Sequence, residues 1–512
     1  MSTFFPRILS VALLASIAFV PSAHMLEAAT KKSSKTAFPE TVSADDLAEA
    51  YAEAAAGGEK VRILIMPGHE PDFGGAEYKG FYEREFAVDI AEKLATELRT
   101  DPNLEVLVAR GNAGWNDDFE YYFDRQGKKI ERFVDEHKKA MEKLEKRGRI
   151  KENEEQAAHN EARSDVALRL YGVSKWADEN DVDLVLHLHL NDETSHAADA
   201  AGDHTGLAIY VPDSIYGNAK ASKAIAEPIF ERLNAYTATS TSGLETRGIV
   251  EDRELIAIGA YNTASMPSLL IEYGYIYEPR ITDGAREQVF ADYAYATALG
   301  VKDFFGSAAR PRFGTSILPY QFTTDVTASS SADSRGLYAL QAALRDQGFY
   351  PGTESSLAVC PVSGLMNVCT PASIKAFQAA RGIVQTGTLD HATRSALNTA
   401  YGLATTESPA ASVARAPAAS AGTCTAFASS LAPEATDADT NGEVTRLQQI
   451  LAKDPSVYPE GKVTGYFGTA TLAAVKRFQV QQKVTTASSA SYGLVGPATK
   501  AALQKACSTA AS

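Results

Sequence analysis

The stretch DLVLHLHLND (183–192) has the apolar composition of a buried strand, yet it carries two histidines two residues apart. Residues at i and i+2 of a strand point to the same face, so His187, His189 and Asn191 project together, opposite the leucines. A third histidine, His69, follows another apolar run. Because neutral imidazole is a good ligand for zinc, histidines on one edge of a sheet indicate a metal site.

The position of each histidine along its strand indicates which ones are the better candidates for metal ligands. In α/β sheets, ligands gather beyond the carboxyl ends of the strands. His189 is nearer that end than His187, and the strand predicted at 61–68 delivers His69 and Glu70 to the same kind of edge. A lone histidine at a strand end is more often a hydrogen-bonded structural residue, but a pair with carboxylates nearby favours metal binding.

A carboxylate is expected to complete the ligand set. A hydrolytic zinc site uses three protein ligands and leaves the fourth position for water, and two histidines with one glutamate are a known set. The candidates are Glu70, Glu83 and Glu85. Glu83 and Glu85 cannot both aim at one point from a helix, because residues at i and i+2 do not share a face. Spacing alone does not choose among the three.

A further glutamate, Glu272, lies inside the predicted strand of PSLLIEYGYI (267–276). A charge in such a strand is costly unless it is paired or functional. One interpretation is a buried salt bridge. The other is a general base for the attacking water, with its pKa adjusted by burial.

Strand and helix patterns alternate around these residues. The predicted strands are 61–68, 104–111, 183–190, 206–212 and 268–276, and the predicted helices are 83–98, 218–236 and 285–305. This alternation indicates an α/β fold in which helices sandwich a mostly parallel sheet.

A densely charged segment, 115–164, interrupts the alternation. It carries both signs of charge, lacks strand character and contains i,i+4 pairs such as Glu142–Lys146, so it is predicted to be helical. A solvated helical excursion and a lid over an active site are both open interpretations.

Bulk properties narrow the class of protein. The 512 residues carry a formal net charge of −15, which argues against a nucleic-acid partner. Residues 1–23 have an early arginine, a short apolar run and small residues, which is the layout of a signal peptide. The segment therefore predicts export to the periplasm, cell wall or medium without stable membrane insertion, and an uncleaved anchor is the alternative.

The chain is predicted to divide into several units. After the signal come a polar tether or first helix (24–59), a catalytic domain (60–306), a linker (307–334), a small three-helix module (335–400), a second linker (401–442) and a second module (443–508). The two modules are an internal repeat, because each has Leu-Gln early, Phe-Gln in the middle and Ala-Thr-x-x-Ala-Leu late. The composition of the linkers, rich in Ala, Ser, Thr and Pro, is typical of flexible spacers.

The four cysteines agree with export. Cys360 and Cys369 are close in sequence, and Cys424 and Cys507 bracket the last segment, so 360–369 and 424–507 is the natural pairing of three. Free buried thiols are the alternative.

Six motifs occur in an order that resembles the zinc-dependent N-acetylmuramoyl-L-alanine amidases, which cleave bacterial peptidoglycan. They are ILIMPGHE, YEREFAVDIAEKL, VLVARG, LVLHLHLND, GLAIYVP and MPSLLIEYGYI, and they cover roughly residues 61–305. The resemblance implies that His69, Glu83 and His189 bind zinc and that Glu272 is catalytic. Glu83 is preferred to Glu85 because it precedes Leu94 by the spacing usual in that family.

The sequence departs from the family at several places. Glu70 stands where glycine is usual, His187 stands where serine is usual, and the segment after Arg110 is longer than in compact members. Some relatives carry a helix that blocks the zinc, so 115–164 could be such a lid, relieved by an activator protein. The repeated units resemble peptidoglycan-binding modules of cell-wall hydrolases. His196, His204 and His391 are expected in loops or at the surface.

Two other functions remain open from the sequence. A different zinc hydrolase, such as a carboxypeptidase or an N-acyl amino acid deacylase, would also use two histidines and a glutamate. Such an enzyme needs an arginine for a free carboxylate, and Arg247 or Arg253 could serve. A non-catalytic wall-binding protein with a degenerate hydrolase domain is the other alternative.

Overall fold

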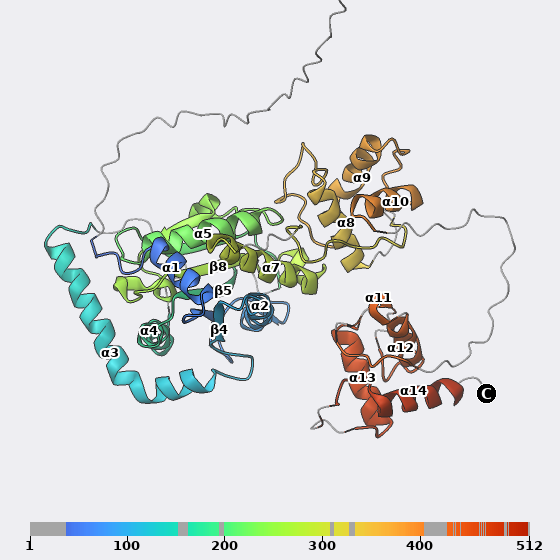
Figure 1. The fold of residues 1–512 in the computed structure, drawn as a ribbon, viewed down its shortest axis with the longest axis horizontal. Helices are drawn as coiled ribbons and strands as arrows, with labels where there is room; N and C mark the ends of the chain where they lie inside the picture. Colours follow the sequence, from blue (N-terminus) through green and yellow to red (C-terminus); the bar gives the residue numbers. More distant parts are fainter. Residues whose placement is uncertain are drawn as a thin grey trace, which may run out of the picture.

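A six-stranded sheet forms the centre of the region between residues 61 and 304 in the computed structural model (Figure 1). Its strand order is β4–β1–β5–β8–β6–β7. The strands are β1 (Val61–Pro67), β4 (Leu104–Val108), β5 (Leu184–Asn191), β6 (Ala208–Pro212), β7 (Ile249–Asp252) and β8 (Ser268–Tyr275). Neighbouring strands are parallel except β6 and β8, which are antiparallel. The predicted mostly parallel α/β fold is confirmed.

The structure describes 37–151, 162–193, 199–307, 312–326, 333–403 and, with interruptions at 434, 436, 441, 460, 462, 464, 466, 486–488 and 490, residues 427–509. The predicted signal peptide, 1–23, lies outside the described residues. Within them, no helix combines the length and the apolar character needed to cross a membrane.

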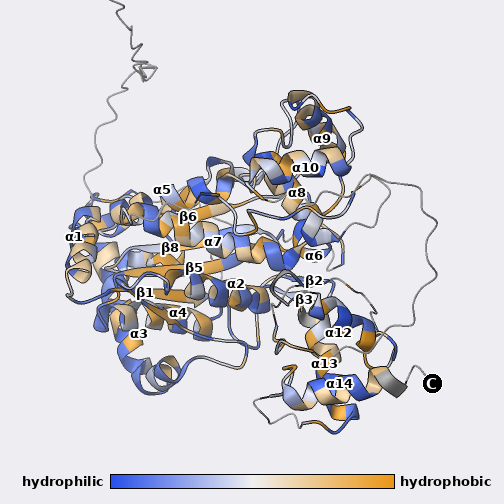
Figure 2. Ribbon diagram, turned by 45° about the vertical axis from the view of Figure 1, so that its right-hand side comes forward, coloured by the Kyte–Doolittle hydropathy of each residue, from blue (hydrophilic) through white to orange (hydrophobic). Residues whose placement is uncertain are grey.

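Helices cover both faces of the sheet, and the strands between them are strongly apolar (Figure 2). One face packs against α2 (Glu83–Leu98), α5 (Ala219–Asn234) and α7 (Arg286–Phe304). The predicted stripe of α2 is buried there, at Phe86, Ile90, Leu94 and Leu98. The strands have buried residues on both faces, as expected of a sheet covered on both sides.

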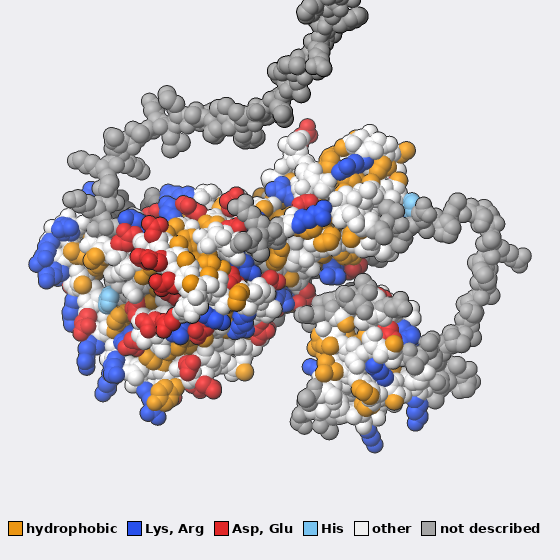
Figure 3. Space-filling view, in the orientation of Figure 1, with side chains coloured by type: hydrophobic (Ala, Val, Ile, Leu, Met, Phe, Trp, Pro, Cys, Tyr) orange, Lys and Arg blue, Asp and Glu red, His pale blue; other side chains and the backbone are white. Residues whose placement is uncertain are grey.

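The other face of the sheet packs against α4 (Ser164–Glu179), and α3 (Asp117–Lys146) packs on α4. The 30-residue α3 buries an apolar stripe that includes Phe119, Ile130 and Val134. Lysines and arginines project outward from its outer edge, at the left of Figure 3. The helical prediction for 115–164 therefore holds for α3, and residues 152–161 lie outside the described part.

Some elements were not predicted. The strand β7 and a two-stranded hairpin, β2 (Glu77–Tyr78) with β3 (Phe81–Tyr82), are shorter than the runs that periodicity detects. The segment expected to be a tether or first helix contains α1 (Ala44–Ala55), which begins at a capping box made by Ser43 and Asp46.

The repeated segments form two similar helical units. The first contains α8 (Ser334–Asp346), α9 (Cys369–Ala380) and α10 (His391–Ala400), and the second contains α11 (Asp437–Thr440), α12 (Glu443–Leu451), α13 (Thr469–Gln481) and α14 (Pro497–Thr509). We call these units module 1 and module 2. A cystine joins Cys360 to Cys369 as expected; the second pairing involves Cys424, which lies outside the described residues.

The Leu-Gln and Phe-Gln motifs have the same structural task in both modules. Gln378 is fully buried and donates to Thr393 Oγ1 at 2.8 Å, while its carbonyl accepts from the amide of Gly387. Gln479 makes the same pair of contacts with Thr499 and Gly493. The glutamine of Phe-Gln thus ties the Ala-Thr of the third motif to the glycine turn before it.

The predicted linker 307–334 is not a free spacer over its described residues. Residues 312–326 lie against α7, and Ile317, Leu318, Phe322 and Val326 are buried in the same core as the sheet. This expectation is corrected. The composition suggested a solvated segment, but apolar residues at these four positions are enough to anchor it.

Candidate metal centre

His69 lies two residues after the end of β1 and stands in a strained backbone conformation. Its φ is +66°, a region that residues other than glycine seldom adopt. Such strain persists only where the surrounding structure fixes it, and it is common at functional sites. Arg110, which is 1% exposed, donates from Nε to the carbonyl of Pro67 at 3.2 Å and also donates to the carbonyl of Gly68. The arginine therefore fixes the turn that presents His69.

Glu83 is the first residue of α2 and is buried. One carboxylate oxygen accepts from the amide of Ala76 at 2.8 Å, and the other accepts from the amide of Leu190 at 3.1 Å. The side chain thus links the hairpin before α2 to the end of β5.

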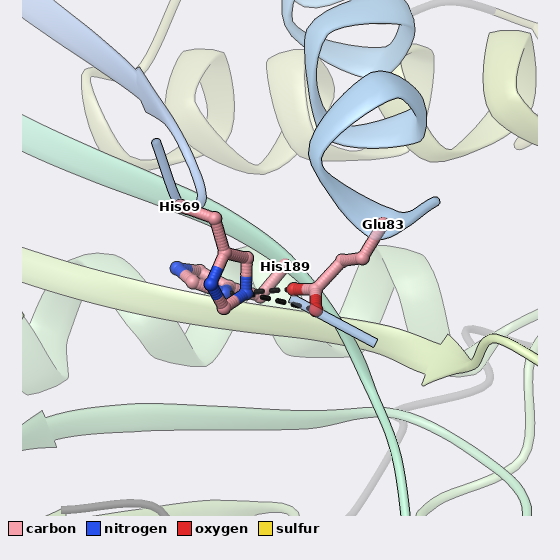
Figure 4. Close-up of side chains that lie close together, drawn as sticks. All are labelled: His69, Glu83 and His189. Carbon is pink, nitrogen blue, oxygen red and sulfur yellow. Dashed lines mark hydrogen bonds and ion pairs between the residues drawn. The ribbon is translucent and has the colours of Figure 1, made fainter. Parts of the chain in front are cut away.

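The structure brings His69, Glu83 and His189 together (Figure 4). Glu83 Oε2 lies 2.8 Å from His69 Nε2, and Glu83 Oε1 lies 2.9 Å from His189 Nδ1. One candidate ligand atom from each residue lies within 4.8 Å of the others. Two imidazoles and a carboxylate at this spacing suit a divalent transition metal. The donor set therefore fits a metal ion.

Glycines leave the room that these side chains occupy. A Cβ at Gly68 would lie 2.5 Å from the His189 ring. A Cβ at Gly75, whose φ is +85°, would lie 2.9 Å from the His69 ring and 3.1 Å from a Glu83 oxygen. The turn sequence after β1 is therefore constrained by the cluster itself.

Electrostatics favour an ionised Glu83. Burial alone would raise the pKa of its carboxyl, but the charges and hydrogen bonds of His69 and His189 hold that pKa well below its usual range. Metal coordination requires this ionised carboxylate together with neutral imidazoles.

Glu272 lies next to the cluster on the neighbouring strand. It pairs in register with His189 across β5 and β8 and is 5% exposed. Burial, followed by the negative charges of Glu83 and Glu245, raises the pKa of its carboxyl well above the usual range. One of its oxygens, Oε2, has no hydrogen-bond partner among the described residues. In the described part of the chain, Glu272 forms no salt bridge of the kind considered from the sequence.

A second buried carboxylate, Glu245, lies near Glu272 and was not predicted. It accepts hydrogen bonds from the amide of Asn191 (2.6 Å) and the hydroxyls of Tyr210 (2.8 Å), Ser240 (2.5 Å) and Tyr275 (3.0 Å). Its short 3-10 helix gives no periodic signal. Asn191 on the polar face of β5 was the one visible hint, since a buried amide needs a partner.

Glu70, the departure from the usual glycine, is not in the ligand cluster. Its carboxylate accepts from Trp115 Nε1 at 3.1 Å and from Arg169 Nε at 2.8 Å. Both partners flank the long insertion, so the insertion's ends hold the loop that follows His69. The lid hypothesis for 115–164 stays a prediction.

The remaining candidates lie elsewhere. Glu85 is exposed, while His187 is buried and its burial lowers the pKa of its imidazole to about 3. His204 and His391 are partly or fully exposed, and His196 lies outside the described residues. The charge of Arg253 is paired with Asp213 at 2.9 Å, and Arg247 is exposed.

Comparison with protein families gives two matches. Residues 63–303 match the family described as N-acetylmuramoyl-L-alanine amidase. Residues 334–397 and 440–503 match the family described as putative peptidoglycan binding domain. No curated protein matches the chain.

Solved structures similar to the chain include an N-acetylmuramoyl-L-alanine amidase from Clostridium difficile 630, with 19% identity, 49% of this chain and 100% of that chain covered, and a TM-score of 0.32. Another is the N-acetylmuramoyl-L-alanine amidase AmiC2 of Nostoc punctiforme, with 18% identity, 49% and 99% coverage and a TM-score of 0.30. A third is the catalytic domain of the amidase CwlV from Bacillus (Paenibacillus) polymyxa var. colistinus, with 17% identity, 48% and 98% coverage and a TM-score of 0.30.

Proposed function

We propose that this chain, whose residues 63–303 belong to the N-acetylmuramoyl-L-alanine amidase family, is an exported zinc enzyme that cleaves peptidoglycan. The bond cut joins the lactyl group of N-acetylmuramic acid to L-alanine. The observation that carries the proposal is the cluster of His69, Glu83 and His189 beside the buried Glu272, all at one edge of the sheet inside the matched region.

The proposed roles follow from the donor atoms and their surroundings. His69, Glu83 and His189 hold the ion, which when bound polarises the scissile carbonyl and lowers the pKa of the attacking water. Glu272 accepts the proton of that water and returns it to the leaving amine. Burial raises the pKa of its carboxyl, and a general base with a raised pKa also returns the proton more readily.

The two modules support peptidoglycan as the polymer bound. Both match the peptidoglycan-binding family, and we propose that they raise the local concentration of the polymer at the metal site. Work on such a polymer takes place outside the cytoplasm, which agrees with the export predicted from 1–23. An activator protein acting through 115–164 is a further part of this hypothesis.

The test is product analysis of digested peptidoglycan. An amidase releases stem peptides with N-terminal alanine, whereas a carboxypeptidase releases residues from the other end. We expect such peptides from the full chain with zinc, and their loss with a chelator and return with added zinc. Chelator-resistant release, or release of carboxyl-terminal residues alone, would contradict the proposal.

Variants separate an enzyme from a degenerate wall-binding protein. Glu272→Gln should lower the rate by about 10²–10⁴-fold, the usual worth of general acid–base catalysis, without loss of bound zinc. Glu83→Gln should abolish both zinc binding and activity. Glu85→Gln, two residues along on the exposed side of α2, is the matched control and should change neither. Equal activity of Glu272→Gln and the wild type would remove Glu272 from the mechanism.

A further inference from the structure

We call residues 63–303 the amidase-family region. A hollow of about 530 Å³ lies between this region and module 1. Asn234, Ala238 and Thr239, at and after the end of α5, line one side. Arg345 and the loop 348–358 of module 1 line the other side. Thr239, Thr353, Ser355 and Ser356 are among the lining residues. The volume falls within the ordinary range of ligand sites.

The hollow lies toward the same edge of the sheet as the metal cluster. Thr239 forms a bridge with Leu207, the residue before β6, and the next residue, Ala208, pairs with Glu272 of β8. Only two strand positions therefore separate the wall of the hollow from the proposed base.

Arg345 gives the hollow a positive charge. It is half-buried, and it donates from Nε to the carbonyl of Ala235 at 2.9 Å and from Nη1 to the carbonyl of Tyr350 at 3.2 Å. Among the described residues, no carboxylate forms an ion pair with it. A guanidinium has five N–H donors, and two carbonyl contacts leave donors for an anionic ligand.

Module 2 does not repeat this feature. Alignment of the Leu-Gln motifs places Leu340 and Gln341 opposite Leu447 and Gln448, and Arg345 then falls opposite Ala452. The cation is therefore not required by the fold of the module. The arginine occurs only in the module that packs against the amidase-family region.

We propose that this hollow binds a carboxylate-bearing stem peptide of the same peptidoglycan strand that is cut at the metal cluster. Module 1 then forms one wall of an extended substrate cleft. The proposal rests on the function proposed above and adds a subsite to it: Arg345 pairs with a peptide carboxylate, and the surrounding hydroxyls accept or donate to the peptide and sugar groups.

The experiment compares cleavage of two polymers and one small substrate by the full chain with zinc. The polymers are peptidoglycan with free stem-peptide carboxylates and the same material with those carboxylates amidated. The small substrate is N-acetylmuramoyl-L-alanine amide, which has the scissile bond but no stem-peptide carboxylate. We expect the wild type to prefer the free polymer by about tenfold in kcat/KM, a typical worth of one charged pair. Arg345→Gln should remove that preference, and Arg345→Lys should restore part of it.

A second variant tests whether the hollow must be open, independently of its charge. Ser356 is exposed on the wall of the hollow, and Ser356→Trp should lower kcat/KM on both polymers severalfold more than on the small substrate. The matched controls are Arg381→Gln and Val384→Trp on another exposed part of module 1, and they should leave all three substrates unaffected. Melting curves confirm that each variant is folded. If Ser356→Trp does not fold, Thr353→Trp takes its place.

Failure of the subsite and failure of the proposed function give different results. If the wild type cleaves the small substrate but Arg345→Gln keeps the preference for free carboxylates, or Ser356→Trp cleaves the polymers like the wild type, the subsite proposal is wrong. If the wild type releases no peptide with N-terminal alanine from any substrate, the amidase function itself fails, and with it the subsite that depends on it.

Discussion

The two modules share a family match and the same buried glutamine contacts, but they are embedded differently. Module 1 belongs to the hydrophobic core of the sheet, since Leu337 and Leu344 of α8 lie in one cluster with Phe290 of α7. Module 2 has its own cluster, which includes Leu447 and Phe478. The repeated motifs therefore determine the fold of each module, while other positions determine where a module lies.

The differing positions are visible once the modules are aligned on their Leu-Gln motifs. Tyr338 in module 1 donates its hydroxyl to Asp292 of α7 at 2.8 Å, and Thr445 stands at that place in module 2. Arg345 donates to the carbonyl of Ala235, and its counterpart is Ala452. Module 1 has long polar side chains where it meets the amidase-family region, and module 2 has short ones.

Removal of each module should give the largest contrast. A chain ending at residue 403 lacks module 2 and should keep the melting temperature of the amidase-family region. A chain ending at residue 306 also lacks module 1 and exposes the apolar face of α7, so its melting temperature should fall by about 10 °C or more. Calorimetry of both shortened chains is the measurement. Equal melting temperatures would show that module 1 is a tethered unit like module 2.

Replacement of Asp292 should have the next largest effect. This buried carboxylate accepts from Thr315, from the amide of Ser316 at 2.9 Å and from Tyr338, so it joins α7 to the segment 312–326 and to module 1. Asp292→Ala leaves several buried donors without an acceptor and should cost about 3 kcal/mol in the free energy of unfolding.

The control for Asp292 is Glu443 of module 2. Its carboxylate accepts from the amides of Ala428 and Ser429, both within the second unit. Glu443→Ala should destabilise module 2 alone. Urea unfolding measures the loss of stability in each variant. Hydrogen exchange at β5 of the folded protein separates the two cases, because only Asp292→Ala should increase exchange there. Increased exchange at β5 in both variants would contradict separate cores.

Gln341 and Gln448 stand at matching positions, so the same substitution can be compared in the two modules. Gln341 accepts from the amides of Ser363 and Gly364, and Gln448 accepts from the amide of Gly465. Replacement of either by alanine leaves buried amides unpaired and should cost about 2 kcal/mol to its own module. Gln341→Ala should also lower the melting temperature of the amidase-family region, whereas Gln448→Ala should not. A single calorimetric trace per variant shows which transition moves.

Much of the fold followed from periodicity in the sequence. Strands such as β5 and β8 are long apolar runs, and α2 carries a regular stripe, so local pattern and tertiary burial agree. The hairpin β2–β3 and the strand β7 are too short to show a period. The place of β7 depends on pairing with β6, which a local pattern does not contain, and the two-residue strands of the hairpin pair only with each other.

The candidate site was predictable in its histidines but not in its supporting groups. His69 and His189 stand at the ends of apolar strands, where a polar residue is conspicuous. Glu83 and Glu85 were equivalent by spacing, and burial separates them in the structure. Glu245 and Arg110 act through hydrogen bonds to residues far away in sequence, so no local signal marked them.

The smallest contrast concerns one hydroxyl at the boundary of module 1. Tyr338→Phe removes the hydrogen bond to Asp292 and keeps the ring buried, so it should cost about 1 kcal/mol, the net worth of a typical hydrogen bond. Thr445→Val at the matching place in module 2 keeps the size of the side chain and should not change the unfolding of the amidase-family region. If the two variants had the same effect on hydrogen exchange at α7, the polar contact would not distinguish the modules, and their different burial would rest on apolar packing alone.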